Sequence, residues 1–118
     1  MIIDYDEIAR FQKRLLEASE RLDSMTNGVA LARQVVEYDS DRRKKALAME
    51  VAPLIGEMSA VAAEVVGRAS PRYARAMGEL AKQYESAQRV MAEWEAAKIA
   101  FEAARSVLSV GKESMRLT

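Results

Sequence analysis

The second half of the chain repeats an apolar residue every seven positions, and this repeat is the strongest constraint on the fold. The repeat comprises Tyr73, Leu80, Ala87, Trp94, Phe101, Leu108 and Met115. Intermediate positions are filled first by Met77, Tyr84 and Met91 and later by Val90, Ala97, Ala104 and Gly111. The intermediate apolar positions thus move gradually from one side of the repeat to the other. This is typical of a nearly straight α-helix, because two turns of 3.6 residues slightly exceed the seven-residue repeat. The pattern predicts one helix over about 71–116, roughly 65–70 Å long at about 1.5 Å per residue.

A turn is predicted at 66–71, just before this helix. Ser70 supplies a hydroxyl for the N-cap, and Pro71 suits the first helical position because proline has no N–H to leave unpaired. Gly67 accepts the left-handed dihedral angles of a C-cap, so we expect the preceding helix to end there.

The first half carries a similar repeat and predicts a first helix over about 4–66. Its seam comprises Ile8, Phe11, Leu15, Ala18, Leu22, Met25, Val29, Ala32 and Val36. Beyond the charged segment 37–45 the repeat resumes four residues out of phase, at Leu47, Val51, Leu54, Met58, Val61 and Val65. Such a stutter locally unwinds a coiled coil without ending the helix.

Two places can kink or break this first helix. Asn27-Gly28 is a plausible stop, because both residues accept left-handed dihedral angles, although the heptad phase runs on unchanged from Leu22 to Val29. Near 53–56, Pro53 removes a backbone hydrogen bond and clashes with the preceding turn, and Gly56 follows it.

These elements predict an all-α fold: a long, antiparallel, coiled-coil-like helical hairpin forming a single domain over 1–118. A third helix forms if the chain folds back at Asn27-Gly28. A two-helix hairpin buries only one stripe of each helix, which is a thin core for 118 residues. We therefore expect a homo-oligomer, with a dimer in a four-helix arrangement favoured.

Composition argues against an enzyme. The chain has no cysteine and no histidine, which excludes disulfides, thiolate or imidazole zinc ligands and Ser/His or Cys/His nucleophile pairs. Glu93 and Glu95 flank Trp94 on polar surfaces, without the burial or the shared site that acid–base or metal chemistry needs, and no glycine-rich phosphate loop occurs. We predict no catalytic, cofactor-binding or metal-binding residues and no cofactor.

Neither a targeting segment nor a membrane span is expected. The opening residues 1–7 are acidic where a signal peptide needs positive charge. The most apolar stretch, 58–66, contains Glu64 and is too short to cross a bilayer. We therefore expect a soluble, cytoplasmic protein that does not bind membranes.

Three groups of basic residues are candidate contacts for nucleic acid or for a partner protein. They are the run Arg42, Arg43, Lys44 and Lys45, the turn group Arg68, Arg72 and Arg75, and the C-terminal group Arg105, Lys112 and Arg116. Basic stripes can follow a phosphate backbone, and they can equally pair with Glu on a neighbouring helix. With 18 basic and 18 acidic residues the chain is neutral overall, which favours ion pairing and solubility.

The end of the second helix carries a motif: Ala104-Arg105-Ser106-x-Leu108-Ser109-x-x-Lys112-Glu113-x-Met115-Arg116. It resembles the C-terminal end of a group of small, uncharacterised phage and prophage helical-hairpin proteins, which finish in an RS-x-L-S-x-x-K-x-x-x-R pattern. Such proteins are often encoded near single-strand annealing and recombination functions. The resemblance implies a phage setting, hence the host cytoplasm, and a non-enzymatic role.

Two functions follow as hypotheses. The first is a non-enzymatic phage or prophage interaction protein that self-associates and binds a protein partner. The alternative is an accessory nucleic-acid-binding protein of a phage recombination module.

Overall fold

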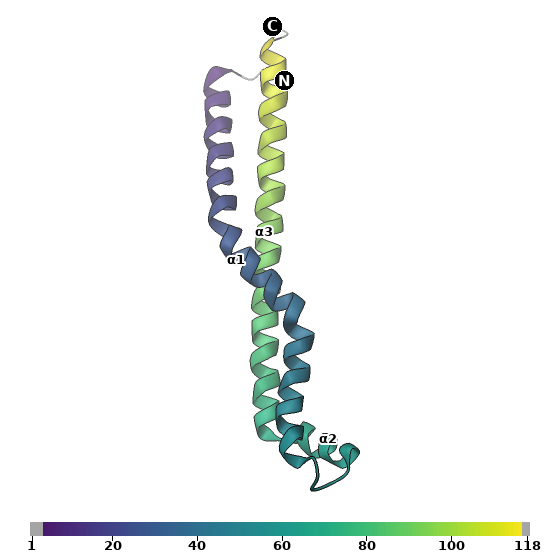
Figure 1. Cartoon of the computed structure of the whole chain (residues 1–118). Helices are drawn as coiled ribbons and strands as arrows, with labels where there is room; N and C mark the ends of the chain where they lie inside the picture. The colour runs from purple at the N-terminus through teal and green to yellow at the C-terminus, as the bar shows by residue number, and fades with distance from the viewer. Residues whose placement is uncertain (1–3, 117–118) are drawn as a thin grey trace. The chain divides into compact units, whose positions relative to one another are not determined.

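The computed structural model describes residues 4–116, apart from the side chains of Ser114 and Met115. Helix α1 (Tyr5–Val51) is followed by a short 3-10 helix, η1 (Ala52–Leu54), by α2 (Ala60–Arg68) and by α3 (Pro71–Arg116). No β-strand occurs within 4–116. The chain is an all-α helical hairpin in which α1 and α3 run in opposite directions, as predicted (Figure 1).

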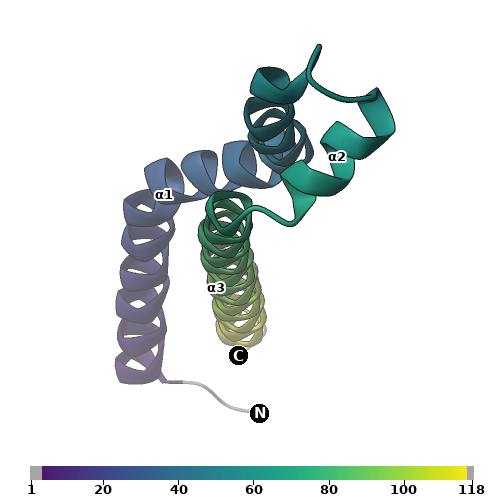
Figure 2. The same ribbon diagram turned by 90° about the horizontal axis from the view of Figure 1, so that it is seen from below.

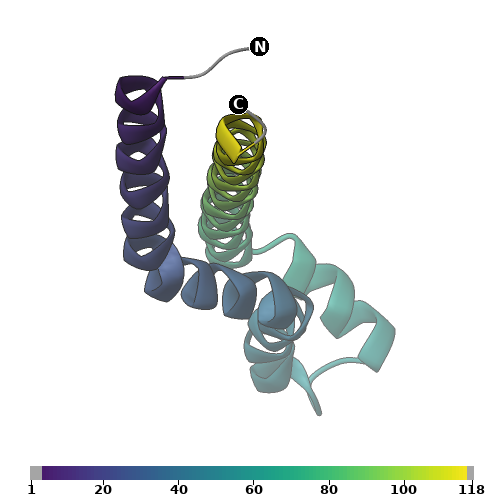
Figure 3. The ribbon, with the colours of Figure 1, turned by 90° about the horizontal axis from the view of Figure 1, so that it is seen from above.

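The contacts of the chain form two compact units, which we describe separately. The terminal unit combines residues 1–29 with 90–118, and the turn unit comprises residues 30–89. Within the terminal unit, the first part of α1 lies beside the last part of α3 (Figure 1). Within the turn unit, the rest of α1 lies beside the start of α3, and α2 connects the two (Figures 2 and 3).

The apolar residues of the predicted heptad seams are the residues that pack between α1 and α3 in both units. Every seam position from Ile8 to Val36 on α1, and from Tyr73 to Gly111 on α3, is buried or half-buried. In the terminal unit Ile8 and Leu108 form a buried cluster, and Phe11 and Leu15 pack against it. Met115 also belongs to the predicted seam, but its side chain lies outside the described residues.

Helix α1 begins at a cap and passes through its first predicted break. The Asp4 carboxylate accepts a hydrogen bond from the Glu7 backbone N–H at 2.8 Å, which pairs one of the free donors of the first turn. Asn27 and Gly28 are both helical, and Gly28 does not have a positive φ. The chain therefore does not fold back there, because the uninterrupted seam outweighs the local preference of Asn-Gly.

At Pro53 the first helix breaks, which is one of the two outcomes predicted for 53–56, so the stretch predicted as one helix over 4–66 consists of α1, η1 and α2. α1 ends at Val51, since a residue before proline disfavours helical dihedral angles and proline itself cannot donate to the preceding turn. Gly56 then takes a φ of 95°, a left-handed conformation that suits glycine. A new helix starts at Ser59, whose hydroxyl accepts a hydrogen bond from the Ala62 N–H at 3.2 Å.

Because α2 is a separate helix, it does not continue the seam of α1. The stutter predicts Val61 and Val65 on the seam, but their side chains are 76% and 64% exposed. α2 instead buries Ala63 and Gly67. The predicted positions Leu54 and Met58 are half-buried, but the new N-cap resets the rotation of the helix, so the heptad register of α1 does not extend into α2.

Gly67 is a contact residue and not the predicted C-cap, a position that Ala69 occupies. A Cβ at Gly67 would lie 3.0 Å from Val51 Cγ2 and 3.6 Å from Glu50 Cβ. The missing side chain is what allows α2 to approach the end of α1 so closely.

Candidate interaction surfaces

The basic run lies on α1 in the turn unit, and one of its members is held within the fold. Arg43 donates from Nε to Asp39 Oδ2 at 2.8 Å, one helical turn away. It also lies 3.9 Å from the sulfur of Met77 on α3. Arg43 therefore serves α1–α3 packing and is a poor candidate for an external contact.

The other three members of the run are free. Arg42, Lys44 and Lys45 are exposed and form no ion pair with any residue in the described part of the chain. Tyr38, 48% exposed, stands one helical turn before Arg42 on the same side of α1. This side of the helix presents cations next to an aromatic ring, a combination that suits phosphates and bases.

The turn group is largely occupied by neighbouring acids. Arg72 lies 3.4 Å from Glu50, whose side chain is 18% exposed. Ser70 donates to the same carboxylate at 3.2 Å while accepting hydrogen bonds from the backbone N–H groups of Arg72 and Tyr73. Ser70 is therefore the N-cap of α3, as predicted, and it ties the cap to α1.

Arg68 pairs within α2 itself. Its guanidinium donates from two nitrogens to Glu64 Oε1, at 3.2 and 2.8 Å. These hydrogen bonds raise the pKa of Arg68 by more than its slight desolvation lowers it, so the residue stays cationic at physiological pH. Of the turn group, Arg75 is exposed and forms no ion pair with the described residues.

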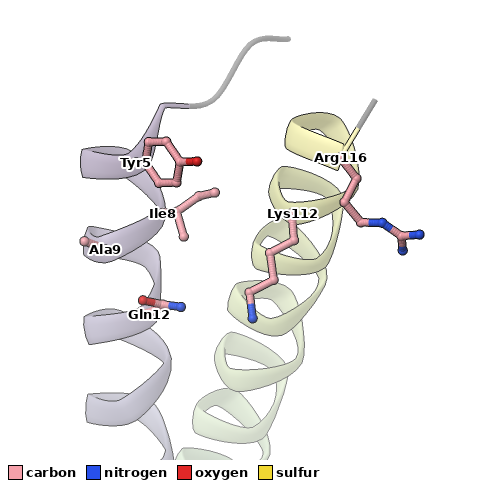
Figure 4. Close-up of a pocket in the computed structure, with 6 residues that line it drawn as sticks. All are labelled: Tyr5, Ile8, Ala9, Gln12, Lys112 and Arg116. Atoms are coloured by element: carbon pink, nitrogen blue, oxygen red, sulfur yellow. The ribbon is translucent and has the colours of Figure 1, made fainter. Parts of the chain in front are cut away.

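The C-terminal group belongs to the terminal unit. Arg116 pairs with Glu113 at 3.6 Å, and Arg105 and Lys112 are exposed. Lys112 and Arg116 line an open groove of about 580 Å³ with Tyr5, Ile8, Ala9 and Gln12 of α1. Figure 4 shows Ile8 pointing from α1 toward α3, whereas Arg116 points away from α1.

The candidate basic residues are divided between the two units. The free cations of the run and Arg75 lie in the turn unit, while Arg105, Lys112 and Arg116 lie in the terminal unit. Four of the ten candidates, Arg43, Arg68, Arg72 and Arg116, already form an ion pair with a Glu or Asp of the chain.

Exposed aliphatic side chains are the surface feature that the sequence reasoning missed. On α3 of the terminal unit, Ile99 and Val110 are 66% and 64% exposed, and Val107 is also exposed. On the turn unit, Val61 and Val65 of α2 lie open, as does Ile55. The sequence did contain a signal for α3, because Ile99, Val107 and Val110 lie eight and three positions apart, on one side of a helix and outside the heptad seam.

Two other kinds of site are absent from the part of the chain that the structure describes. No three acidic residues there lie close enough together to hold a metal ion. No helix among the described residues combines the length and the apolar character that crossing a bilayer requires.

Comparison with known proteins identifies no relative: no protein-family model, no curated protein and no solved structure matches this chain.

Proposed function

We propose that this chain is a non-enzymatic helical interaction protein that self-associates and binds a protein partner. The observation that supports this best is the exposure of aliphatic side chains on regular helix faces, Ile99 and Val110 on α3 and Val61 and Val65 on α2. Regularly spaced apolar residues on the outer face of a helix are typical of surfaces that pack against another helix.

A thin core supports the same proposal. Among the described residues, no large side chain is less than 2% exposed, and the most buried positions include the small residues Ala32, Ala63, Ala87 and Ala97. A core of this kind buries little apolar area per residue, so association would add burial that the single chain lacks.

The phage or prophage setting is proposed from the resemblance of residues 104–116 alone. In that setting the protein would act in the host cytoplasm, as an adaptor that joins other proteins and not as a catalyst.

Sedimentation velocity from about 1 to 100 µM tests the self-association. We expect a dimer to dominate within this range, since weak but specific helix pairing corresponds to micromolar dissociation constants. A monomer at every concentration would contradict this part of the proposal.

Paired affinity captures test the binding of a protein partner. Wild-type chain and a Val61→Asp/Val65→Asp variant are immobilised and exposed to the same lysate of the source cells. We expect a protein retained by the wild type to be lost with the variant, because a charge on the α2 face disfavours its burial. Identical sets of retained proteins would argue against a partner surface on α2.

The second candidate, an accessory nucleic-acid-binding role, is favoured by the cations Arg42, Lys44 and Lys45, unpaired within the described part of the chain, with the exposed Tyr38 one helical turn before Arg42. Anisotropy of labelled single- and double-stranded oligonucleotides at about 50 and about 200 mM salt tests it, because phosphate contacts weaken steeply as salt rises. A variant with these cations changed to Glu is compared with an Arg10→Glu/Lys13→Glu/Arg21→Glu control of equal charge. Binding lost only in the first variant would bring this function forward, and no binding at low salt would dismiss it.

A further inference from the structure

We infer that the groove between the start of α1 and the end of α3 binds an amphiphilic carboxylate, a small molecule with an aliphatic body and one negative charge. The groove lies within the terminal unit and has a volume of about 580 Å³. Pockets for small molecules typically measure roughly 300–1,000 Å³. Such a site belongs to a single chain, so it goes beyond the proposed self-association and does not depend on it.

The wall of the groove that α1 provides is mainly apolar. Ile8 points from α1 toward α3 and is 8% exposed (Figure 4). The exposed Ala9 and the ring of Tyr5 continue this wall. From Tyr5 to Gln12 the wall is about 10 Å long, at about 1.5 Å per residue. An extended aliphatic chain of similar length can lie along it and remove apolar surface from water.

A positive charge and an amide stand toward one end of this wall. Figure 4 shows the ammonium group of Lys112 at the level of the Gln12 amide, which points from α1 toward α3. Lys112 forms no ion pair with any residue that the structure describes. The ammonium and the amide N–H groups can both donate to a carboxylate, and hydrogen bonds between charged groups are about twice as strong as neutral ones.

The acidic residues near the start of α1 do not line the groove. Of the described residues that line it, none carries a carboxyl group. The Asp4 carboxylate caps α1 by accepting the backbone N–H of Glu7. Asp6 lies two residues before Ile8, which places it on the opposite side of the helix. Glu7 lines a separate groove.

At the end of α3, the nearest acidic residue is already paired. Glu113 lies 3.6 Å from Arg116, whose side chain points away from α1 (Figure 4). Lys112 is therefore the cation that remains for a ligand in this groove, and one cation matches one carboxylate.

The lining favours a small molecule over a peptide. Each residue of a peptide brings a backbone N–H and C=O, which need hydrogen-bond partners when they are buried. The side chains of Ile8 and Ala9 provide none. An aliphatic carboxylate has a single polar group, which Lys112 and Gln12 can bind, and the rest of the molecule needs only apolar contact.

Titration of the isotopically labelled chain with octanoate, followed by NMR, tests the site. We expect saturable shifts of the amide resonances of Ile8, Ala9, Gln12 and Lys112, with a dissociation constant on the order of 1 mM. Octanol has the same chain without the charge, and butyrate has the charge with a shorter chain. Each should bind about 5-fold more weakly or worse. No saturable shift with octanoate, or equal binding of octanol, would overturn the inference.

Variants of the lining residues identify the contacts. Lys112→Met removes the charge and keeps the length of the side chain, so it should weaken octanoate binding about 5-fold and leave octanol binding unchanged. Ala9→Glu places a carboxylate on the exposed edge of the wall and should weaken octanoate binding at least as much. Circular dichroism checks that each variant keeps its helices.

Lys13→Met is the matched control. It removes the same charge from an exposed position of α1 that faces away from Ile8, and it should bind octanoate like the wild type. If Lys112→Met also binds octanoate like the wild type, the assigned role of Lys112 is wrong and the inference fails.

Two further outcomes would assign the binding elsewhere and overturn the inference. Shifts centred on Ile99 and Val110, which are exposed on α3, would mean that octanoate adsorbs to any apolar surface. A tripeptide with an apolar last residue could instead bind more tightly than octanoate at the groove and lose its affinity when its carboxylate is amidated. The site would then fit the C-terminus of a protein and not a free carboxylate.

Discussion

At the residue scale, Ser70 joins the start of α3 to the end of α1. Its hydroxyl caps α3 through the N–H groups of Arg72 and Tyr73 and donates to Glu50 on α1. The half-buried Glu50 also pairs with Arg72, so one carboxylate receives both the cap and the first cation of the helix. This small network holds the two long helices together where the chain reverses.

Replacing Ser70 with Ala is expected to lower the free energy of unfolding by about 1–2 kcal/mol, because the cap and the hydrogen bond to Glu50 are lost together. Chemical denaturation monitored by circular dichroism measures this change. Ser86 is the matched control, since it is exposed within α3 and forms no side-chain hydrogen bond with the described residues. Ser86→Ala should change stability by less than about 0.5 kcal/mol, and equal effects at both positions would dismiss the network.

At the scale of the elements, one glycine lies inside a continuous helix and another lies where the chain leaves a helix. Gly28 lies within α1 and has no atom close to where a Cβ would stand. Gly56 has a φ of 95° in the connection between α1 and α2. The same substitution should therefore act in opposite directions at these positions.

Gly28→Ala is expected to raise the free energy of unfolding by about 0.5–1 kcal/mol, because alanine is the better helix former. Gly56→Ala should lower it by about 1–2 kcal/mol, because alanine is strained at positive φ. Urea unfolding of the two variants measures both signs. A destabilising Gly28→Ala would mean that the helix does break at Asn27-Gly28.

At the scale of the whole molecule, the hairpin has a single seam of contact within each unit and a core built largely from half-buried side chains. The proposed dimer would make stability depend on association, since binding of a second copy to the folded chain stabilises the folded state by mass action.

The melting temperature should therefore rise on the order of 5 °C when the protein concentration increases from about 2 to about 200 µM. Thermal melts followed by circular dichroism over this range provide the test. A melting temperature that does not change with concentration would contradict association in the folded state.

The sequence by itself determined the all-α hairpin, both heptad seams and the cap at Ser70-Pro71, because helical periodicity and capping depend on residues close together in the chain. It also predicted that 53–56 would interrupt the first helix, since proline acts locally. Only the tertiary structure decided that α1 continues through Asn27-Gly28, where packing of the seam overrides a local stop signal.

The features that the sequence did not predict arise from contacts between residues far apart in the chain. Several contacts depend on which helix faces meet, and the sequence alone does not say which faces those are. They are the close approach of Gly67 to Val51, the pairing of Glu50 with Arg72 and Ser70, and the contact of Arg43 with Met77. The sequence alone could not separate the engaged cations from the free Arg42, Lys44 and Lys45. Nor could it show that Ile99 and Val110 stay exposed, because exposure depends on which side of α3 the first helix already covers.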